Sequence, residues 1–342
     1  MKLRKRVTAL LAAVLAVSLL AGCGGSKSGS EEEPAAAEGA IGKVIGYPPK
    51  EVNGIIQWGA GGGTDSLMRP LSILAQDILD TNIILDNMTG ETGSIAVQYV
   101  YDQEADGTNL LMGAENPALY DKLDISDLTY DDFECVFLIG DETTGIVVGK
   151  DSPYSSLTEL VNAAKGGTEV TLATTGTGGL PWEVAAMITG ITGAEFTQKE
   201  YSSDASAKEA ILSGECDFTV SKVQMGYQEY KSGDYKWLCM LSTEPVALMS
   251  DVPLITAEYP EFEDLLPWGP FYGVFVKEGT DAQVIKILAD AFSKAYENSS
   301  YKTMLGYFYI NPLGYTGDKA EEYISNWRAN MLDILAKENV IQ

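Results

Sequence analysis

Short apolar runs alternate with amphipathic segments along most of the chain. The run "VNGIIQW", which starts at Val52, is followed by a segment in which Leu67, Leu71, Leu74 and Ile78 recur every three or four residues. The run predicts a strand, and the recurrence predicts a helix with one apolar face. By the same criteria, we expect strands at 52–58, 81–87, 109–114, 135–140, 144–150, 169–176, 215–220 and 235–242, and within 266–280.

Helices are expected between most of these strands and at the end of the chain. Ser155 or Ser156 is suited to cap the start of one helix and Gly166 to end it, while Pro181 fits the first turn of another. The expected helices span 67–78, 95–101, 156–167, 180–193, 203–213, 280–299 and 319–339. This alternation predicts α/β lobes with mostly parallel sheets flanked by helices.

The first 23 residues have the pattern of a secretory signal: a basic start, "MKLRKR", and then the apolar run "VTALLAAVLAVSLL". Leu20–Cys23 resembles the lipobox of bacterial lipoproteins, in which the cysteine is lipid-modified and becomes the new N-terminus. The alternative is an ordinary cleaved signal with an incidental Cys23. Residues 24–48 are rich in Gly, Ser, Glu and Ala, so we expect them to form a disordered tether.

No other stretch approaches the ~20 apolar residues of a membrane span. We therefore expect the protein to be lipid-anchored to the outer face of the cytoplasmic membrane through Cys23. The formal charge is −26, and it becomes −30 without the four basic residues of the signal. Such a charge repels nucleic acid, so no nucleic-acid partner is expected, and any anion site must be built locally.

The composition argues against most kinds of catalytic and metal site. The chain has no histidine, which removes the commonest general base and metal ligand. We expect no catalytic residues, no metal and no cofactor. Acidic residues between Asp121 and Asp132 are spaced like a solvated loop; the alternative is a hydrolase that uses paired carboxylates. Cys135, Cys216 and Cys239 are expected to be buried free thiols, with one disulfide as the alternative.

Four glycines follow the first predicted strand in "WGAGGGTD", from Trp58 to Asp65. A P-loop would need a lysine after its last glycine, and none is present. The dinucleotide-binding fingerprint Gly-x-Gly-x-x-Gly fails at its sixth position, where Thr64 stands. The order strand, glycine turn, helix nevertheless places the unpaired N–H groups of a helix start beside a close-approaching backbone, which is an anion-binding arrangement.

Within this first turn, Thr64 is the expected N-cap and Gly63 is expected to need a positive φ. Asp65 is expected to orient the loop or to face a cationic group of the ligand. Arg69, four residues later, is better placed to hold Asp65 than to bind a ligand carboxylate. The alternative for the whole turn is a tight connection in which glycine serves packing alone.

The arrangement recurs at "LATTGTGGLPWEV", where a strand ends, residues 174–179 turn, and a helix begins. Two such turns more than a hundred residues apart suit two lobes that face one cleft. A third candidate is Ser202–Asp204, between a strand and a helix, where simple N-capping is the alternative. Lys222 is the other basic group near these loops by position.

At this point the chain resembles the substrate-binding receptors of tripartite tricarboxylate transporters, the Bug proteins. "WGAGGGTDSLMRPLSILAQDI" is similar to the family's "PGG-x-D…R" signature, and "TTGTGG" to its "GS-x-G" loop. Four further segments resemble parts of the family: "ILDNMTGETGSIAVQYVYDQEADGTNLLMG", "ENPALY", "SSDASAKEAILSGECDF" and "SDVPLITAEYPEFED". All six segments occur along the chain in the family's order. The resemblance covers about residues 50 to 340.

The resemblance implies a two-lobe periplasmic-binding-protein fold, type II-like, with a ligand cleft between the lobes. It implies lobe 1 at 49–147 and 271–342 and lobe 2 at 148–270. It also implies a receptor, expected to be monomeric, that binds a small carboxylate and delivers it to a permease of one large and one small subunit. By position, the ligand contacts would be Trp58, Ala60, Gly61, Gly62, Gly63, Thr64, Asp65, Asn116, Thr175, Gly176, Thr177, Gly178, Ser203 and Asp204.

The chain departs from the family pattern in a few places. It has Gln57–Trp58 where the family often has Pro-Phe, and Ser202–Ser203 where a glycine often follows the tyrosine. Trp182, Trp268 and Tyr272 are expected to pack in the core or the hinge, with stacking on a ligand as the alternative. A receptor of the same fold that serves another transporter or a sensor is the alternative function.

Overall fold

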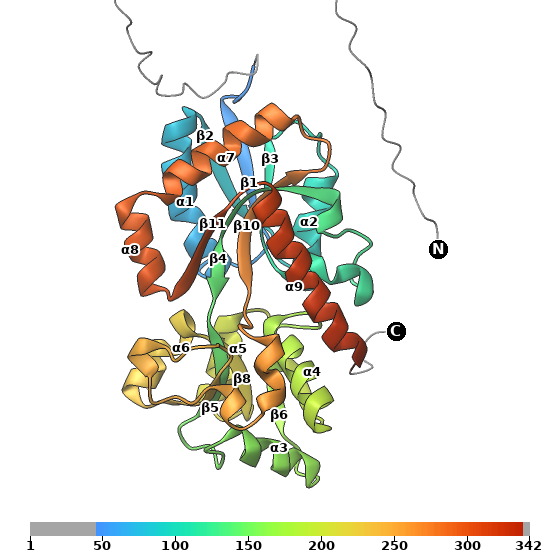
Figure 1. Ribbon diagram of the computed structural model, residues 1–342, viewed down its shortest axis with the longest axis vertical. Helices are drawn as coiled ribbons and strands as arrows, with labels where there is room; N and C mark the ends of the chain where they lie inside the picture. The colour runs from blue at the N-terminus through green and yellow to red at the C-terminus, as the bar shows by residue number, and fades with distance from the viewer. Residues whose placement is uncertain (1–45, 338–342) are drawn as a thin grey trace, which may run out of the picture. The chain divides into compact units, whose positions relative to one another are not determined.

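The computed structural model describes residues 46–337, and they contain two β-sheets with helices around them (Figure 1). The first sheet has six strands in the order β11-β4-β10-β3-β1-β2. We call the part of the molecule built around this sheet the first lobe. Its strands are β1 (Glu51–Ile56), β2 (Asn82–Asn87), β3 (Asn109–Ala114), β4 (Phe133–Glu142), β10 (Phe271–Lys277) and β11 (Ile310–Tyr315).

The second sheet has five strands in the order β7-β6-β8-β5-β9, and it forms the second lobe. This order repeats that of five strands of the first sheet, β2-β1-β3-β10-β4. In each sheet, the inserted strand follows a crossing from the other lobe: β10 lies between β3 and β4, and β5 lies between β8 and β9. The strands are β5 (Thr144–Gly149), β6 (Thr171–Thr174), β7 (Thr197–Glu200), β8 (Phe218–Lys222) and β9 (Tyr235–Met240).

Both sheets are mixed, so the prediction of mostly parallel sheets was wrong. β1 pairs in parallel with β2 and β3, and β6 does so with β7 and β8. All other pairs among the described strands are antiparallel. The cause lies in the crossings: β1 and β3 end where the lobes meet, whereas β10 returns from the second lobe and begins there.

Helices cover the faces of both sheets (Figure 1). In the first lobe, α1 (Gly63–Leu79) packs against α7 (Ala282–Tyr296), and α8 (Ser299–Tyr307) contacts both. Leu67 and Leu71 of α1 are fully buried there, as the apolar spacing predicted. On the other face of the first sheet lies α2 (Ser94–Tyr101).

The second lobe carries α3 (Leu157–Lys165), α4 (Leu180–Thr192), α5 (Asp204–Leu212) and α6 (Val223–Ser232). The last helix, α9 (Asp318–Lys337), contacts β4 of the first lobe and α4 of the second. Its Trp327 stacks on Trp268, which precedes β10, with ring centroids 5.1 Å apart. One apolar core therefore continues from the first lobe into the second along α9.

Most of the predicted elements are present, and the capping residues predicted for α3 and α4 are confirmed. Ser156 caps α3 by accepting a hydrogen bond from the N–H of Glu159, Gly166 ends that helix, and Pro181 lies in the first turn of α4. α6, α8 and β11 were not predicted, and β7 was expected only as a strand before Ser202, without bounds. β7 lacked an apolar pattern because it is an exposed edge strand.

Two predicted boundaries differ from the structure. The tether was predicted to reach residue 48, but Tyr47 is buried and its hydroxyl donates to the carbonyl of Gly107 at 2.9 Å. Residues 144–147, predicted for lobe 1, belong to β5 in the second sheet. The other lobe boundaries stay a prediction, and the signal, Cys23 and most of the tether lie outside the described residues.

Candidate functional site

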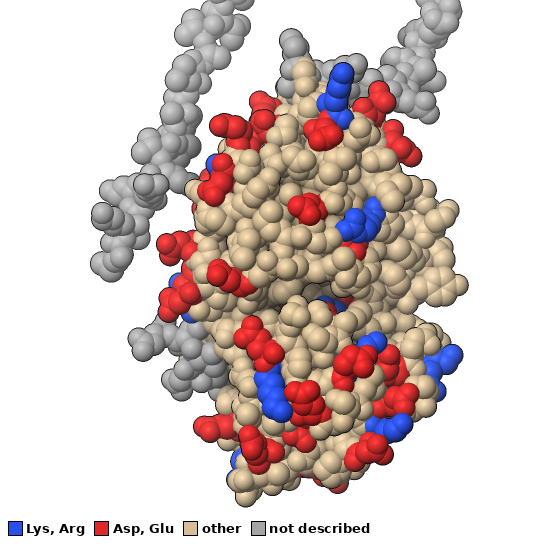
Figure 2. Space-filling model, turned by 180° about the vertical axis from the view of Figure 1, so that it is seen from behind, with Lys and Arg blue, Asp and Glu red and all other residues tan. Residues whose placement is uncertain are grey.

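A pocket of about 120 Å³ lies where the carboxyl ends of the parallel strands of both sheets meet. In the space-filling view the surface is hollowed between the two lobes, and basic side-chain atoms show inside the hollow (Figure 2). Its lining comes from four short segments and five single residues. The lining residues are Trp58–Thr64, Ala114–Asn116, Thr175, Gly179, Leu180, Ser202–Ala205, Lys222, Met225, Pro270 and Tyr272.

The first glycine loop is held from behind by a clamp of three side chains. Asp65 accepts hydrogen bonds from the N–H of Gly61 at 3.0 Å and from Asn87 at 2.9 Å. Arg69 pairs with the same carboxylate at 2.7 Å, and Asn87 also donates to the carbonyl of Trp58. Asp65 therefore orients the loop and lies outside the pocket lining. Arg69 holds Asp65, as its spacing of four residues predicted.

We expect Asp65→Ala to loosen this loop. The substitution leaves the Gly61 N–H and Arg69 without their acceptor, which is expected to cost about 1–3 kcal/mol of unfolding free energy and to weaken ligand binding. Burial alone raises the pKa of Asp65, but Arg69, Gly61 and Asn87 outweigh it and hold the pKa below its usual value. The contribution is therefore present above the ordinary pKa and lost as the pH falls through the lowered one.

Chemical denaturation at pH 7 and at pH 3 measures this effect. The matched control is Asp77→Ala, which changes an exposed carboxylate on the same helix. The interpretation of Asp65 is rejected if both variants unfold at the same denaturant concentration as the wild type.

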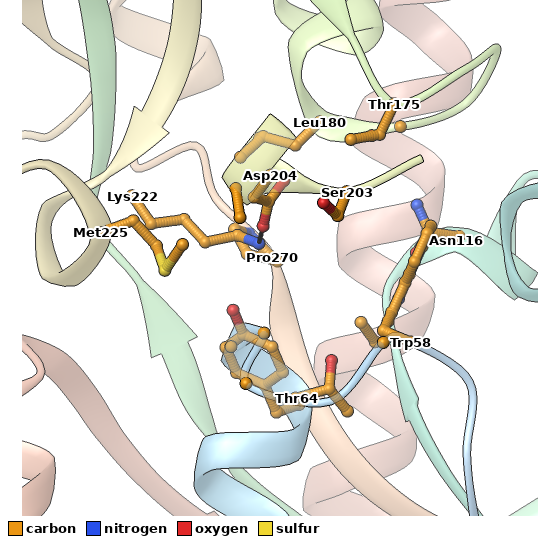
Figure 3. Close-up of a pocket in the computed structure, with 18 of the residues that line it drawn as sticks. Trp58, Thr64, Asn116, Thr175, Leu180, Ser203, Asp204, Lys222, Met225 and Pro270 are labelled. Atoms are coloured by element: carbon orange, nitrogen blue, oxygen red, sulfur yellow. Dashed lines mark hydrogen bonds and ion pairs between the residues drawn. The ribbon is translucent and has the colours of Figure 1, made fainter. Parts of the chain in front are cut away.

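Two details of the first loop differ from the prediction. Gly62, not Thr64, is the N-cap of α1, and no side chain caps this helix. Thr64 lies within the first turn and its hydroxyl points into the pocket (Figure 3). The positive φ is found at Gly61, at 77°, and not at Gly63. Gly63 is required for space instead, because a Cβ there would lie 2.8 Å from the hydroxyl of Tyr272.

The second glycine loop serves mainly as a contact between the lobes. Thr175 and Gly179 line the pocket, but the structure places Gly176, Thr177 and Gly178 outside its lining. The side chain of Thr92 donates to the carbonyl of Thr177 at 2.9 Å. The ligand contacts predicted for these three residues stay a prediction, although the carbonyls of Thr177 and Gly178 accept hydrogen bonds from the first lobe.

Asn116 connects the two lobes at the edge of the pocket. Its amide donates to the carbonyl of Gly178 at 2.7 Å and to Glu115 at 3.2 Å. Gln57, fully buried at the end of β1, in turn accepts from the N–H of Ala114 at 3.0 Å. These bonds hold the segment after β3 in one position, facing the glycine loop after β6.

The third candidate segment both caps a helix and lines the pocket. Ser203 is the N-cap of α5 and accepts from the N–H of Ser206 at 3.2 Å. Asp204 pairs with Lys222 at 2.7 Å, and both side chains border the pocket (Figure 3). Capping and site formation, offered as alternatives for Ser203, are thus both observed for the same side chain.

Lys222 is surrounded by more carboxylates than it can neutralise. Burial lowers the pKa of Lys222, but Asp204, Glu142 and Glu115 outweigh burial and raise it, so the ammonium stays charged. Burial raises the pKa of Glu142 to about 7, against the opposing effects of Lys222 and of the hydrogen bond from Tyr272. Burial likewise raises the pKa of Glu115 to about 7.

Of the three aromatic residues expected to pack in the core or the hinge, Trp182 and Trp268 have that role alone. Trp182 packs against the core outside the pocket lining, and Trp268 is buried against α9. Tyr272 is buried, lines the pocket and donates to Glu142, so it does both. Within residues 46–337, all three cysteines are buried free thiols, as predicted.

Sequence reasoning missed six lining residues: Ala114, Glu115, Leu180, Ala205, Met225 and Pro270. A signal existed for Glu115 alone, since a charged residue directly after a buried apolar strand has few reasons to be there other than function. The acidic stretch between Asp121 and Asp132 does not line the pocket. Asp121 forms a bidentate pair with Arg328 at 2.9 Å, and Asp132 accepts from the N–H of Thr129.

The N-termini of three helices border the pocket: α1 through Gly63 and Thr64, α4 through Leu180, and α5 through Asp204 and Ala205. The first N–H groups of a helix have no acceptor within it, and the helix dipole places partial positive charge there. Three such ends around one pocket form a site suited to a small anion.

Residues 67–340 match the protein family described as Tripartite tricarboxylate transporter family receptor. The chain belongs to this receptor family. It is similar to the protein BugT of Bordetella pertussis (strain Tohama I), with 23% identity over 286 residues that cover 82% of this chain and 86% of BugT. The family resemblance inferred from the glycine turns is thereby confirmed.

Several solved structures share the fold of this chain. The periplasmic binding protein BugD superposes with a TM-score of 0.78 at 21% identity and covers 86% of this chain and 99% of its own. MatC of Rhodopseudomonas palustris with bound malate superposes with a TM-score of 0.75 at 21% identity, over 84% of this chain and 100% of MatC. R. palustris Rpa4515 with adipate superposes with a TM-score of 0.76 at 19% identity, over 86% of this chain and 98% of Rpa4515. The predicted two-lobe periplasmic-binding-protein fold is confirmed.

No helix in residues 46–337 is long and apolar enough to cross a membrane. Among the same residues, no group of three or more Cys, Asp or Glu side chains is arranged to hold a metal ion.

Proposed function

We propose that this receptor captures a small carboxylate in the pocket between its lobes and delivers it to a membrane permease of one large and one small subunit. The observation that carries the proposal is the convergence of three helix N-termini and a glycine loop on one pocket. Two structures of the same fold support it, since one holds malate and the other adipate.

In this proposal, the carboxylate is held by backbone N–H groups of the first loop and by hydroxyl groups from the second lobe. The hydroxyls are those of Thr64, Thr175 and Ser203, which line the pocket. Asn116 positions the edge of the site rather than carrying charge. In this proposal, the receptor acts as a monomer and is attached to the membrane through a lipid on Cys23. It catalyses no reaction.

Thermal unfolding of the purified protein against a panel of small carboxylates tests the proposal. A ligand present at 100 times its dissociation constant adds about 2.7 kcal/mol to the unfolding free energy if it binds only the folded state. We expect a shift with at least one carboxylate and none with the corresponding amide, and recovery of the compound unchanged. Shifts only with sugars or with compounds that carry no carboxylate would refute the proposal.

Thr175→Val tests the pocket itself. The variant is expected to lower the affinity for that carboxylate about tenfold, the loss of one hydrogen bond to a charged group, with little change in the melting temperature of the free protein. Thr177→Val is the matched control, since Thr177 is exposed and only its carbonyl is used. Calorimetric titration measures both, and equal affinities for both variants would place the ligand elsewhere.

A further inference from the structure

Glu115 is a buried carboxyl group that borders the pocket and has an unused oxygen. The side chain is 3% exposed and follows directly after β3. One oxygen, Oε1, accepts the hydrogen bond from Asn116 at 3.2 Å. The other, Oε2, has no hydrogen-bond partner anywhere in residues 46–337. A buried polar atom without a partner is costly, so a pocket that leaves one at its wall is suited to a ligand that supplies the partner.

The charges around Glu115 indicate what kind of partner this is. The one ammonium that borders the pocket, that of Lys222, is already engaged by Asp204 at 2.7 Å. Arg69 is directed away, toward Asp65 behind the first loop. Glu142 adds a further carboxyl group behind Tyr272. A second ligand carboxylate would therefore meet acidic groups and no free cation among the described residues.

We propose that the ligand carries a protonated amine beside its carboxylate, as an amino acid does, and that Glu115 accepts a hydrogen bond from this ammonium group. The inference rests on the proposed function, because the carboxylate is still held at the helix N-termini. It narrows the ligand from carboxylates in general to small zwitterions. A cavity of about 150 Å³ admits a molecule the size of benzene, so the pocket of about 120 Å³ suits a small amino acid.

The protonation of Glu115 makes the inference testable by pH. The ammonium binds the ionised carboxylate, and burial raises the pKa of this group to about 7 in the free protein. Amino-acid affinity is therefore expected to rise between pH 6 and pH 8. The other titratable groups that interact with Glu115 are Lys222, Asp204, Glu142, Glu183, Tyr120, Tyr130 and Tyr272. Lys222 keeps its charge throughout this range.

The test is a set of calorimetric titrations with matched pairs that differ only at the amine: alanine and lactate, serine and glycerate, aspartate and malate. We expect one amino acid to bind at least tenfold more tightly than its hydroxy acid at pH 8. Equal or tighter binding of the hydroxy acid would overturn the inference and leave the carboxylate receptor intact. If none of the six compounds binds and no carboxylate shifts the melting temperature, the proposed function itself fails.

Glu115→Gln keeps the shape of the side chain and removes its charge. The variant is expected to lower affinity for the preferred amino acid at least tenfold and to abolish the rise between pH 6 and pH 8, while hydroxy-acid affinity stays equal or rises. Glu278→Gln is the control, since Glu278 is exposed and lies outside the pocket lining. A free-protein melting curve verifies folding. An unchanged ratio of amino-acid to hydroxy-acid affinity in Glu115→Gln would refute the role of Glu115.

Discussion

Replacing Lys222 with methionine is expected to lower the unfolding free energy at pH 8 by about 3 kcal/mol. Removing one partner of a buried ion pair costs about 3–5 kcal/mol, and the lower figure applies because Asp204 is partly exposed. Without the ammonium, Asp204, Glu142 and Glu115 would face one another with no counter-charge. The variant is also expected to lose ligand binding, because the carboxylates of Asp204 and Glu115 would then border a carboxylate site with no ammonium beside them.

The same variant should recover part of its stability at low pH. The pKa values of Glu115 and Glu142 are raised to about 7, so the folded protein binds more protons than the unfolded chain between the ordinary pKa of 4.5 and that value. Their contribution to stability is thus fully present below pH 4.5 and is lost as the pH rises through 7. At pH 5 both groups are neutral and need Lys222 less.

Urea unfolding at pH 5 and pH 8 measures both effects. Lys286→Met is the control, since Lys286 pairs with Asp290 at 2.9 Å on the exposed surface, where a pair contributes about 0–1 kcal/mol. The interpretation of the acidic cluster is wrong if Lys222→Met and Lys286→Met lose the same stability, or if the loss in Lys222→Met does not depend on pH.

Gly269→Ala is expected to lower the unfolding free energy by about 3 kcal/mol or more, at the upper end for an overpacked site. A Cβ at this position would lie 1.8 Å from the carbonyl oxygen of Glu142, which is backbone and cannot rotate away. Glu142 ends the strand that leaves the first lobe, and Gly269 lies just before the strand that returns to it. The two crossings between the lobes are therefore in direct contact.

Gly306→Ala provides the control for a glycine that packing does not require. It lies exposed in α8, and no atom would lie within 4 Å of a Cβ there. This change is expected to raise the unfolding free energy by about 0.5–1 kcal/mol. Thermal and urea unfolding compare the two variants. A wild-type melting temperature for Gly269→Ala would show that the crossings separate readily.

Interactions between residues near in sequence were the ones that could be predicted. The pairing of Arg69 with Asp65 follows from their spacing of four on a helix, and the capping of α3 by Ser156 follows from its position before an apolar repeat. The glycine loop after β1 was also located correctly, because a turn between a strand and a helix occupies a known edge of the sheet.

Interactions between the lobes could not be predicted in the same way. Gly178 was expected at the ligand, but its carbonyl accepts from Asn116, 62 residues earlier in the chain. Glu142 and Tyr272 are 130 residues apart and meet because both crossings pass the same point. Such contacts depend on how the lobes close, and no local pattern of apolar and polar residues records that.

The most direct test of the central claim is a crystal structure of the protein with the tightest-binding compound of the panel. The account predicts a ligand carboxylate about 2.7–3.2 Å from backbone N–H groups between Gly61 and Asp65, with the hydroxyl of Thr175 or Ser203 on its other side. A ligand whose carboxylate lies outside this pocket, or that touches no backbone N–H group at the start of α1, α4 or α5, would contradict it.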